Sequence, residues 1–136
     1  MYNKNKKILI VEDEIAFAEI VKIQLELLGY EVTVATDAYR GTEEIIRGDY
    51  ALVILDLMMP AGGGFSILER IKEFPGKKWT PTVIVTGKTI DDEVRAKAEE
   101  YNVAAIFRKP YNNVKFKKKI KSLVPIRKKE DRGSEF

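Results

Sequence analysis

The stretch LVILDLMMPAGGGFS (residues 52–66) places one carboxylate, Asp56, at the end of an apolar run and follows it with Pro60 and three glycines. Such a short apolar run is typical of a strand that is buried on both faces of a parallel sheet. A charge beside a buried strand lowers stability unless a cation or hydrogen-bond donors meet it. The stretch therefore predicts a central strand that delivers Asp56 to a polar site.

A short apolar strand followed by an amphipathic helix recurs five times along the chain. We expect the strands at residues 7–11, 31–35, 51–55, 82–86 and 104–107. We expect the helices at residues 14–28, 38–47, 65–74, 90–101 and 114–124. Because each crossover between parallel strands is right-handed and covers one side of the sheet, this order predicts a doubly wound α/β fold with helices on both faces.

The length and composition limit the classes of protein that the chain can represent. Its 136 residues suit one domain with one sizeable core. It contains no cysteine and no histidine, which excludes disulfides, thiolate metal sites and a histidine general base. No apolar run approaches the roughly 18 residues of a membrane span, and the start MYNKNKK is polar. We therefore expect a cytoplasmic protein that does not enter a membrane.

The net charge of +3 is unevenly distributed along the chain. Nine of the 24 Lys and Arg residues but only three of the 21 Asp and Glu residues lie from Val114 onward, so the preceding part is acidic. A basic end can attract nucleic acid or a membrane, but it also fits a solvated helix face, and we expect no direct nucleic-acid binding. We expect a domain at residues 1–124 and a disordered basic tail at residues 125–136, whose final GSEF resembles a cloning remnant.

Charged and hydroxyl side chains follow four of the five expected strands. Glu12 and Asp13 come after the first strand and Asp56 after the third. Thr86 ends the fourth strand, and Lys109 follows the fifth. Because the functional crevice of an open α/β sheet lies beyond the carboxyl ends of its strands, we expect these side chains to converge. Each also has an ordinary explanation by itself, since Asp13 could simply cap the following helix.

Taken together, these groups favour a site for a hard cation and a phosphoryl group. Crowded carboxylates repel one another, and Mg²⁺ relieves the repulsion because it prefers oxygen ligands. A lysine ammonium pairs with a carboxylate or a phosphate as a compact point charge. Magnesium and a lysine beside one carboxylate are suited to phosphoryl transfer. The first loop, VEDEIAF, is acidic and has no glycine, which argues against nucleotide binding there.

Four motifs resemble those of the receiver domain of two-component response regulators. They are ILIVEDE (8–14), VILDLMMP with Gly64 beyond it (53–64), VIVTGK (83–88) and FRKPY (107–111). The resemblance covers about residues 6–124 and implies a flavodoxin-like (βα)5 fold with a five-stranded parallel sheet. It also implies a protein that catalyses at most its own phosphorylation and dephosphorylation, rather than an enzyme that turns over a free substrate.

The resemblance implies a role for each residue of the expected site. Asp56 would accept a phosphoryl group from a sensor histidine kinase or a phosphotransfer protein. Asp13, Asp56 and the backbone carbonyl of Met58 would hold Mg²⁺. Glu12 would contribute to the metal site through a water molecule. Lys109 would pair with Asp56 and then with the phosphoryl oxygens.

The resemblance also implies how the signal leaves the site. Thr86 would move toward a phosphoryl oxygen, and Phe107 would turn inward as the switch aromatic. The bond between Lys109 and Pro110 would be cis. A changed surface on the fourth helix, fifth strand and fifth helix would be read by a downstream protein or by an effector domain outside this chain. The domain would be a monomer or a phosphorylation-dependent dimer. The chain departs from the family at Gly63, where the family often has an acid, and with Gly62 this departure predicts a mobile loop.

Two other interpretations of the same residues stay open. The chain could be a receiver-like interaction module that is never phosphorylated, in which Asp56 is structural. It could also be a phosphatase of the haloacid dehalogenase type, which uses an aspartyl nucleophile and Mg²⁺. Those enzymes typically carry a second aspartate two residues after the nucleophile, where this chain has Met58. The chain could be a stand-alone receiver that acts by protein contact, or a domain of a larger regulator or hybrid kinase.

Overall fold

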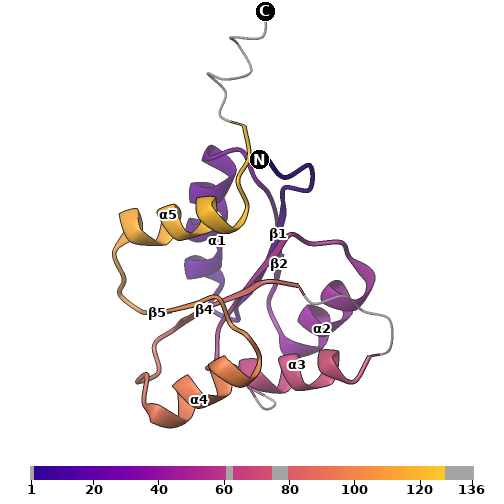
Figure 1. The fold of residues 1–136 in the computed structure, drawn as a ribbon, viewed down its shortest axis with the longest axis vertical. Coiled ribbons are helices and arrows are strands. Elements are labelled where there is room, and N and C mark those ends of the chain that lie inside the picture. The colour runs from indigo at the N-terminus through magenta and orange to yellow at the C-terminus, as the bar shows by residue number, and fades with distance from the viewer. Residues whose placement is uncertain (1, 61–62, 75–79, 128–136) are drawn as a thin grey trace, which may run out of the picture.

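The computed structural model describes residues 2–60, 63–74 and 80–127. These residues form a parallel sheet in the order β2-β1-β3-β4-β5, which confirms the expected (βα)5 fold (Figure 1). The strands are β1 (Lys7–Val11), β2 (Glu31–Ala35), β3 (Leu52–Leu55), β4 (Thr82–Thr86) and β5 (Ala105–Arg108). The helices are α1 (Ile15–Leu27), α2 (Ala38–Arg47), α3 (Gly63–Lys72), α4 (Asp92–Glu100) and α5 (Asn113–Leu123).

The burial of each strand explains its place in the sheet. The strands β3 and β4 are buried along their whole length, and β1 is buried after Lys7. The edge strands β2 and β5 are largely half-buried or exposed. Continuous apolar runs suit positions that are covered on both faces, so the sequence itself selects β1, β3 and β4 for the centre. Asp56 therefore follows the central strand of the sheet.

Helices cover both faces of the sheet (Figure 1). On one face, α1 and α5 share a core cluster that contains Leu25 and Ile120; we call it the α1/α5 cluster. On the other face, α2 and α3 pack around Ile45 and Ile67. The helix α4 places Val94 in a smaller cluster with inward residues of β4 and β5. Across the part of the chain that the structure describes, no helix reaches the length and apolarity needed to span a membrane.

The largest difference from the expected elements is at α3. This helix begins at Gly63 and ends at Lys72, two residues before the start and the end expected from the sequence. Glycine is a poor helix former, so the hydrophobic pattern did not predict a helix that opens on two glycines. The other helices agree with expectation to within two residues at each end, as element boundaries generally do.

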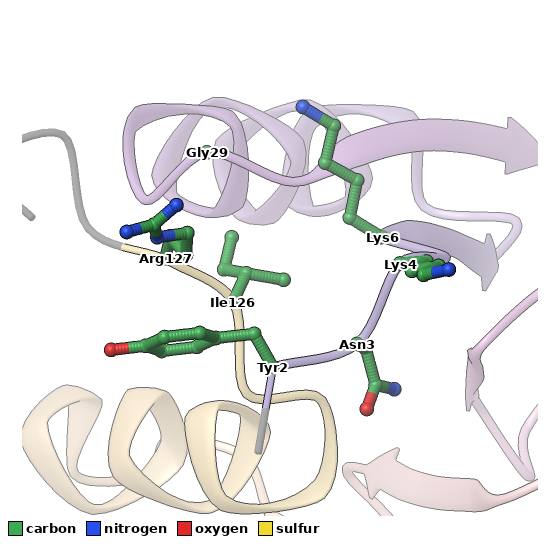
Figure 2. A pocket seen from close by; sticks show the side chains of 7 residues that line it. All are labelled: Tyr2, Asn3, Lys4, Lys6, Gly29, Ile126 and Arg127. Carbon is green, nitrogen blue, oxygen red and sulfur yellow. The ribbon is translucent and has the colours of Figure 1, made fainter. Parts of the chain in front are cut away.

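Ile126 packs against the domain, although we expected disorder from residue 125 onward. Its side chain lies on the α1/α5 cluster. Gly29 makes room for it, because Gly29 has a φ of +106° and a Cβ there would lie 3.2 Å from Ile126 Cδ1. Figure 2 shows the two residues near each other, beside the segment that leads into β1. Residues 128–136, including GSEF, lie outside the described residues, so their disorder stays a prediction.

Candidate functional site

Three carboxylates meet at the carboxyl ends of β1 and β3, where the strand ends led us to expect them. Oxygen atoms of Glu12, Asp13 and Asp56 lie within 4.8 Å of one another. Glu12 is 2% exposed and Asp56 is 5% exposed, whereas Asp13 is open to solvent. Glu14 occupies the N-cap position of the helix α1, and no side chain forms a capping hydrogen bond there. Asp13 therefore does not cap this helix.

The register of the sheet fixes the backbone of the two buried acids. In the ladder between β1 and β3, Val11 is paired with Leu55. The Asp56 N–H continues this ladder by donating to the Val11 carbonyl at 3.1 Å. The Glu12 N–H donates to the Ala35 carbonyl at 3.0 Å on the other side of β1. Both acids therefore leave the sheet from rigid strand ends.

The glycines after Asp56 let the chain turn back close to the site. Gly63 has a φ of +70°, and the Gly64 N–H donates to the Leu57 carbonyl at 3.3 Å. A Cβ on Gly64 would lie 2.5 Å from the Asp56 carbonyl oxygen, so a side chain there would push α3 away from the strand end. Gly62 lies outside the described residues, and the mobility expected of the loop stays a prediction.

Lys109 contacts three carboxylates at once. Its Nζ lies 2.5 Å from Glu12 Oε1. It lies 3.7 Å from Asp56 Oδ2 and 3.7 Å from Glu14 Oε2. We expected Lys109 to pair with Asp56, and that ion pair is present, but the nearest partner is Glu12. The contact with Glu14 was not expected, although this residue follows the same strand end.

The electrostatics of the site follow from burial. Burial raises the pKa of Glu12 from 4.5 to about 7; the hydrogen bond from Lys109 opposes this rise and the nearby Asp56 carboxylate adds to it. Burial lowers the pKa of Lys109, but the carboxylates of Glu12, Asp56 and Glu14 together outweigh it, so the pKa of Lys109 is raised. Lys109 therefore keeps its positive charge at neutral pH, and burial holds the pKa of Glu12 above its ordinary value.

The donor set of the site is consistent with Mg²⁺ binding. Glu12, Asp13 and Asp56 offer carboxylate oxygens, which are the ligands that a hard divalent cation prefers. Mg²⁺ keeps several of its water ligands, and the solvent-exposed position of Asp13 leaves room for them. The Met58 N–H donates to Asp56 Oδ1 at 3.0 Å, so the backbone at residue 58 borders the same carboxylate.

Thr86 ends β4 at the same edge of the sheet and is fully buried. Its Oγ1 accepts a hydrogen bond from the Lys88 N–H at 3.1 Å. Its carbonyl accepts a hydrogen bond from the Lys109 N–H at 2.8 Å, so the backbone ties these two site residues together. The peptide bond between Lys109 and Pro110 is cis.

Phe107 lies on the opposite face of the sheet from Thr86, which contradicts its expected role as the switch aromatic. Phe107 is paired with Val85 and packs against the α1/α5 cluster. Thr86 is paired with Arg108, and successive strand residues point to opposite faces. Ile106 therefore shares the face of Thr86 and packs in the cluster of α4. Ile106 lies two residues before the strand partner of Thr86, and it is the register of the structure that identifies this partner.

An aromatic ring that none of the motifs marked also touches Lys109. The Lys109 Nζ lies 4.0 Å from the centroid of the Phe17 ring. Phe17 packs edge-on against Tyr111, with ring centroids 6.2 Å apart. Phe17 follows Asp13 by four residues, about one helical turn, so a helix that begins beside the acids brings this position toward the site. That spacing is the signal that could have found it.

Two of the hollows in the described surface also contain charged side chains. One, of about 340 Å³, borders Asp13 and is also lined by Tyr39 and Met59. The other, of about 290 Å³, opens at the amino ends of the strands (Figure 2). Its lysines, Lys4 and Lys6, extend their ammonium groups in different directions, so these charges do not converge on one ligand. Neither hollow brings together groups that match the acid, threonine and lysine set at the carboxyl edge.

The sheet order and this set of side chains at its carboxyl edge define a receiver-type domain. The family model for the response regulator receiver domain matches residues 8–121, and the chain belongs to this family. The protein is therefore a receiver domain of the two-component response regulators.

The relatives and solved structures agree with this family. The chain is 41% identical over 83 residues to the transcriptional regulatory protein DltR of Streptococcus agalactiae, which covers 61% of this chain and 36% of DltR. A CheY-like receiver domain protein from Methanospirillum hungatei has 30% identity and a TM-score of 0.74, covering 88% of this chain and 97% of that one. The response regulator TrrA of Thermotoga maritima, in complex with Mg²⁺ and BeF, has 28% identity and a TM-score of 0.73, covering 88% and 99%. The chain thus spans little more than a third of DltR.

Proposed function

We propose that Asp56 is the phosphoacceptor of this receiver domain. The observation that carries the proposal is the position of Asp56 Oδ2, which lies 3.7 Å from the Lys109 ammonium. The Asp56 carboxylate also lies beside those of Glu12 and Asp13. Asp13 is exposed, and Glu12 is already bound by Lys109 at 2.5 Å. Asp56 is therefore the buried carboxylate with an oxygen that can react beside a cation.

The proposed reaction is a nucleophilic displacement at phosphorus. An oxygen of the Asp56 carboxylate attacks the phosphorus of a phosphohistidine on a sensor histidine kinase or a phosphotransfer protein. The P–N bond breaks, its electron pair stays on the imidazole nitrogen, and an acyl phosphate forms on Asp56. Because Oδ1 already accepts the Met58 N–H, we assign the attack to Oδ2, which faces Lys109.

Lys109 and Thr86 respond to the new group. A phosphoryl group adds negative charge and several oxygen acceptors where one carboxylate oxygen stood. The Lys109 ammonium then exchanges part of its contact with Glu12 for the phosphoryl oxygens, because charge-assisted hydrogen bonds to them are strong. The Thr86 hydroxyl, at the same edge, gains an acceptor. These two shifts turn a local charge change into a change of surface.

The metal-site residues would lower the electrostatic barrier to this reaction. Asp13, Asp56 and the backbone carbonyl of Met58 would hold Mg²⁺, and Glu12 would contribute through a water molecule. When bound, Mg²⁺ offsets the charge of the carboxylates and of the phosphoryl oxygens. The complex of TrrA with Mg²⁺ and BeF supports Mg²⁺ binding by a domain of similar fold.

Exposed apolar residues on α1 support a protein as the phosphodonor. Ile20, Ile23 and Leu27 are each more than half exposed, and they recur at intervals of three and four residues. They form a stripe on the helix that begins beside the acids. Large exposed apolar side chains that gather on one face mark a protein contact surface. We propose that the kinase or phosphotransfer protein docks on this stripe in the cytoplasm.

The proposed output is a change of surface on α4, β5 and α5. The changed surface would be read by a downstream protein or by an effector domain outside this chain. DltR, which is named a transcriptional regulatory protein, is an example of a longer relative. We propose that the domain itself binds no nucleic acid, turns over no free substrate, and acts as a monomer or as a dimer that forms on phosphorylation.

The test of the proposal is phosphoryl uptake from phosphoramidate, followed by intact-mass spectrometry in the presence of Mg²⁺. We expect wild type to take up one phosphoryl group per chain and Asp56→Asn to take up none. The matched control is Asp49→Asn, which removes the charge of an exposed aspartate at the amino end of β3 and should behave as wild type. Equal uptake by Asp56→Asn and wild type would show that the phosphoacceptor is elsewhere. No uptake by wild type from an active donor would favour the unphosphorylated interaction module.

A further inference from the structure

We propose that Phe17 is a positioning residue for Lys109. The ring of Phe17 holds the Lys109 ammonium over its face and beside the carboxylate of Asp56. The Lys109 Nζ lies 4.0 Å from the centroid of the Phe17 ring. A cation within about 6 Å of a ring centroid is attracted by the negative face of the ring. The proposal deepens the function proposed above and rests on it for the catalytic effect, but the contact itself can be tested without phosphorylation.

This contact differs from the other cation–ring pairs of the described residues. In those pairs the cation lies between 5.7 and 5.9 Å from the ring centroid. The pair of Lys109 and Phe17 is closer, and the Lys109 side chain is only 18% exposed. Attraction between a cation and a ring is stronger where water is partly excluded. The ring of Phe17 is therefore a partner of the ammonium and does not merely lie near its stem.

The Phe17 ring is held in place by a chain of aromatic contacts that ends in the core. It packs edge-on against Tyr111 at an interplanar angle of 87°. Tyr111 in turn lies 4.8 Å from Phe116, which is 0% exposed, and 5.8 Å from Phe107. These contacts connect α1 to the segment that follows β5. The ring thus has a packing partner besides Lys109, and that partner leads into the core.

The geometry explains why Lys109 needs such support. A lysine carries its charge at the end of a flexible four-carbon stem, so the ammonium can take several positions among neighbouring carboxylates. Here the carboxylates of Glu12, Glu14 and Asp56 lie at 2.5, 3.7 and 3.7 Å from Nζ, and each can draw the ammonium a different way. The ring of Phe17 adds an uncharged partner that lowers the number of positions open to the ammonium. We expect this to keep Nζ within reach of Asp56.

The first test uses NMR and needs no phosphorylation. Protons that lie over an aromatic ring resonate upfield, so the ε-methylene protons of Lys109 should appear upfield of those of the other lysines. In Phe17→Leu, which keeps an apolar side chain, they should move to the common lysine position. Resonances of Lys109 that are the same in wild type and in Phe17→Leu would overturn the contact. If Phe17→Leu does not fold, the upfield position in wild type decides the matter.

The second test measures the rate constant of phosphorylation by phosphoramidate in chains that carry a fluorinated phenylalanine at residue 17. Successive fluorines withdraw charge from the ring face but change its shape little. We expect the rate to fall stepwise with each fluorine, by about 2- to 30-fold over the series, in line with the strength of a cation–ring contact. The same series at Phe65, whose ring lies 5.7 Å from Lys97, is the matched control and should leave the rate unchanged.

The two tests separate failure of this proposal from failure of the proposed function. A rate that does not depend on fluorination at residue 17 would show that the ring does not position Lys109 for transfer. Absence of any phosphorylation in the unsubstituted chain would instead refute the proposed function, and the NMR comparison would still decide whether the ring of Phe17 holds Lys109.

Discussion

Glu12 and Lys109 form an ion pair that is largely shielded from solvent. Glu12 is 2% exposed, and its carboxylate takes the tightest of the three contacts that Lys109 makes. Burial nevertheless raises the pKa of Glu12 to about 7, with Lys109 opposing the shift and Asp56 adding to it. Glu12 thus binds its proton more tightly in the folded chain than in the unfolded chain. This difference in proton affinity makes the stability of the folded domain depend on pH.

We predict that Glu12 makes the folded domain less stable as pH rises from about 5 to about 8 in buffer without Mg²⁺. The raised pKa means that the stabilising contribution is fully present below the ordinary value of 4.5 and is lost as pH rises through about 7. The measurement is urea unfolding of wild type and Glu12→Gln, which cannot ionise at this position. Relative to Glu12→Gln, the free energy of unfolding of wild type should fall over this range. A relative rise would mean that the Lys109 contact outweighs burial.

The strand β5 shows how one element serves two faces of the sheet. Phe107 belongs to the α1/α5 cluster, and Ile106 packs beside Val94 in the cluster of α4. Thr86, on the neighbouring strand, faces the side of Ile106. A movement of Thr86 toward a phosphoryl group would therefore reach α4 most directly through Ile106. Phe107 packs against the rings of Tyr111 and Phe116 and lies outside that route.

We predict that Ile106→Ala weakens the response of α4 to activation, whereas Phe107→Leu leaves it intact. The response is the change in backbone amide shifts of residues 92–100 when beryllofluoride, a mimic of the phosphoryl group, is added with Mg²⁺. Phe107→Leu should lower the free energy of unfolding by on the order of 1 kcal/mol, because it removes packing from the core. Loss of the α4 response in Phe107→Leu, with a full response in Ile106→Ala, would restore Phe107 as the switch residue.

The same strand shows what the sequence could and could not predict about the site. The positions of Asp56, Thr86 and Lys109 followed from where apolar runs end, because parallel strands deliver their ends to one edge. The face of a strand residue depends on register, and an error of one residue exchanged Ile106 for Phe107. Lys109 lies nearer to Glu12 than to Asp56 because of the distances between the strand ends, and a sequence does not contain these distances.

At the scale of the whole molecule, the reactive edge and the first and last described residues lie at opposite edges of the sheet. The acids follow the carboxyl ends of β1 and β3, whereas the Asn3 N–H donates to the Pro125 carbonyl at the amino edge. Figure 1 shows the N-terminus and the end of α5 close together. A charge change at Asp56 therefore reaches the described C-terminal segment only through the sheet and its helices. The packing of Ile126 at this edge depends on a tertiary contact with Gly29. The polar composition of the tail did not predict this contact.

The central claim is that this architecture makes Asp56 the residue that carries the phosphoryl group. The most direct measurement is to phosphorylate the chain with phosphoramidate and Mg²⁺, reduce it with borohydride, and sequence its peptides by tandem mass spectrometry. Borohydride converts an aspartyl phosphate to homoserine and thereby marks the acceptor. We predict homoserine at position 56, no homoserine at Asp13, and at Glu12 no 2-amino-5-hydroxypentanoic acid, which is the product that a glutamyl phosphate would give. The account would be contradicted if a different carboxylate were reduced. It would also be contradicted if a chain that has taken up the phosphoryl group showed no reduced carboxylate.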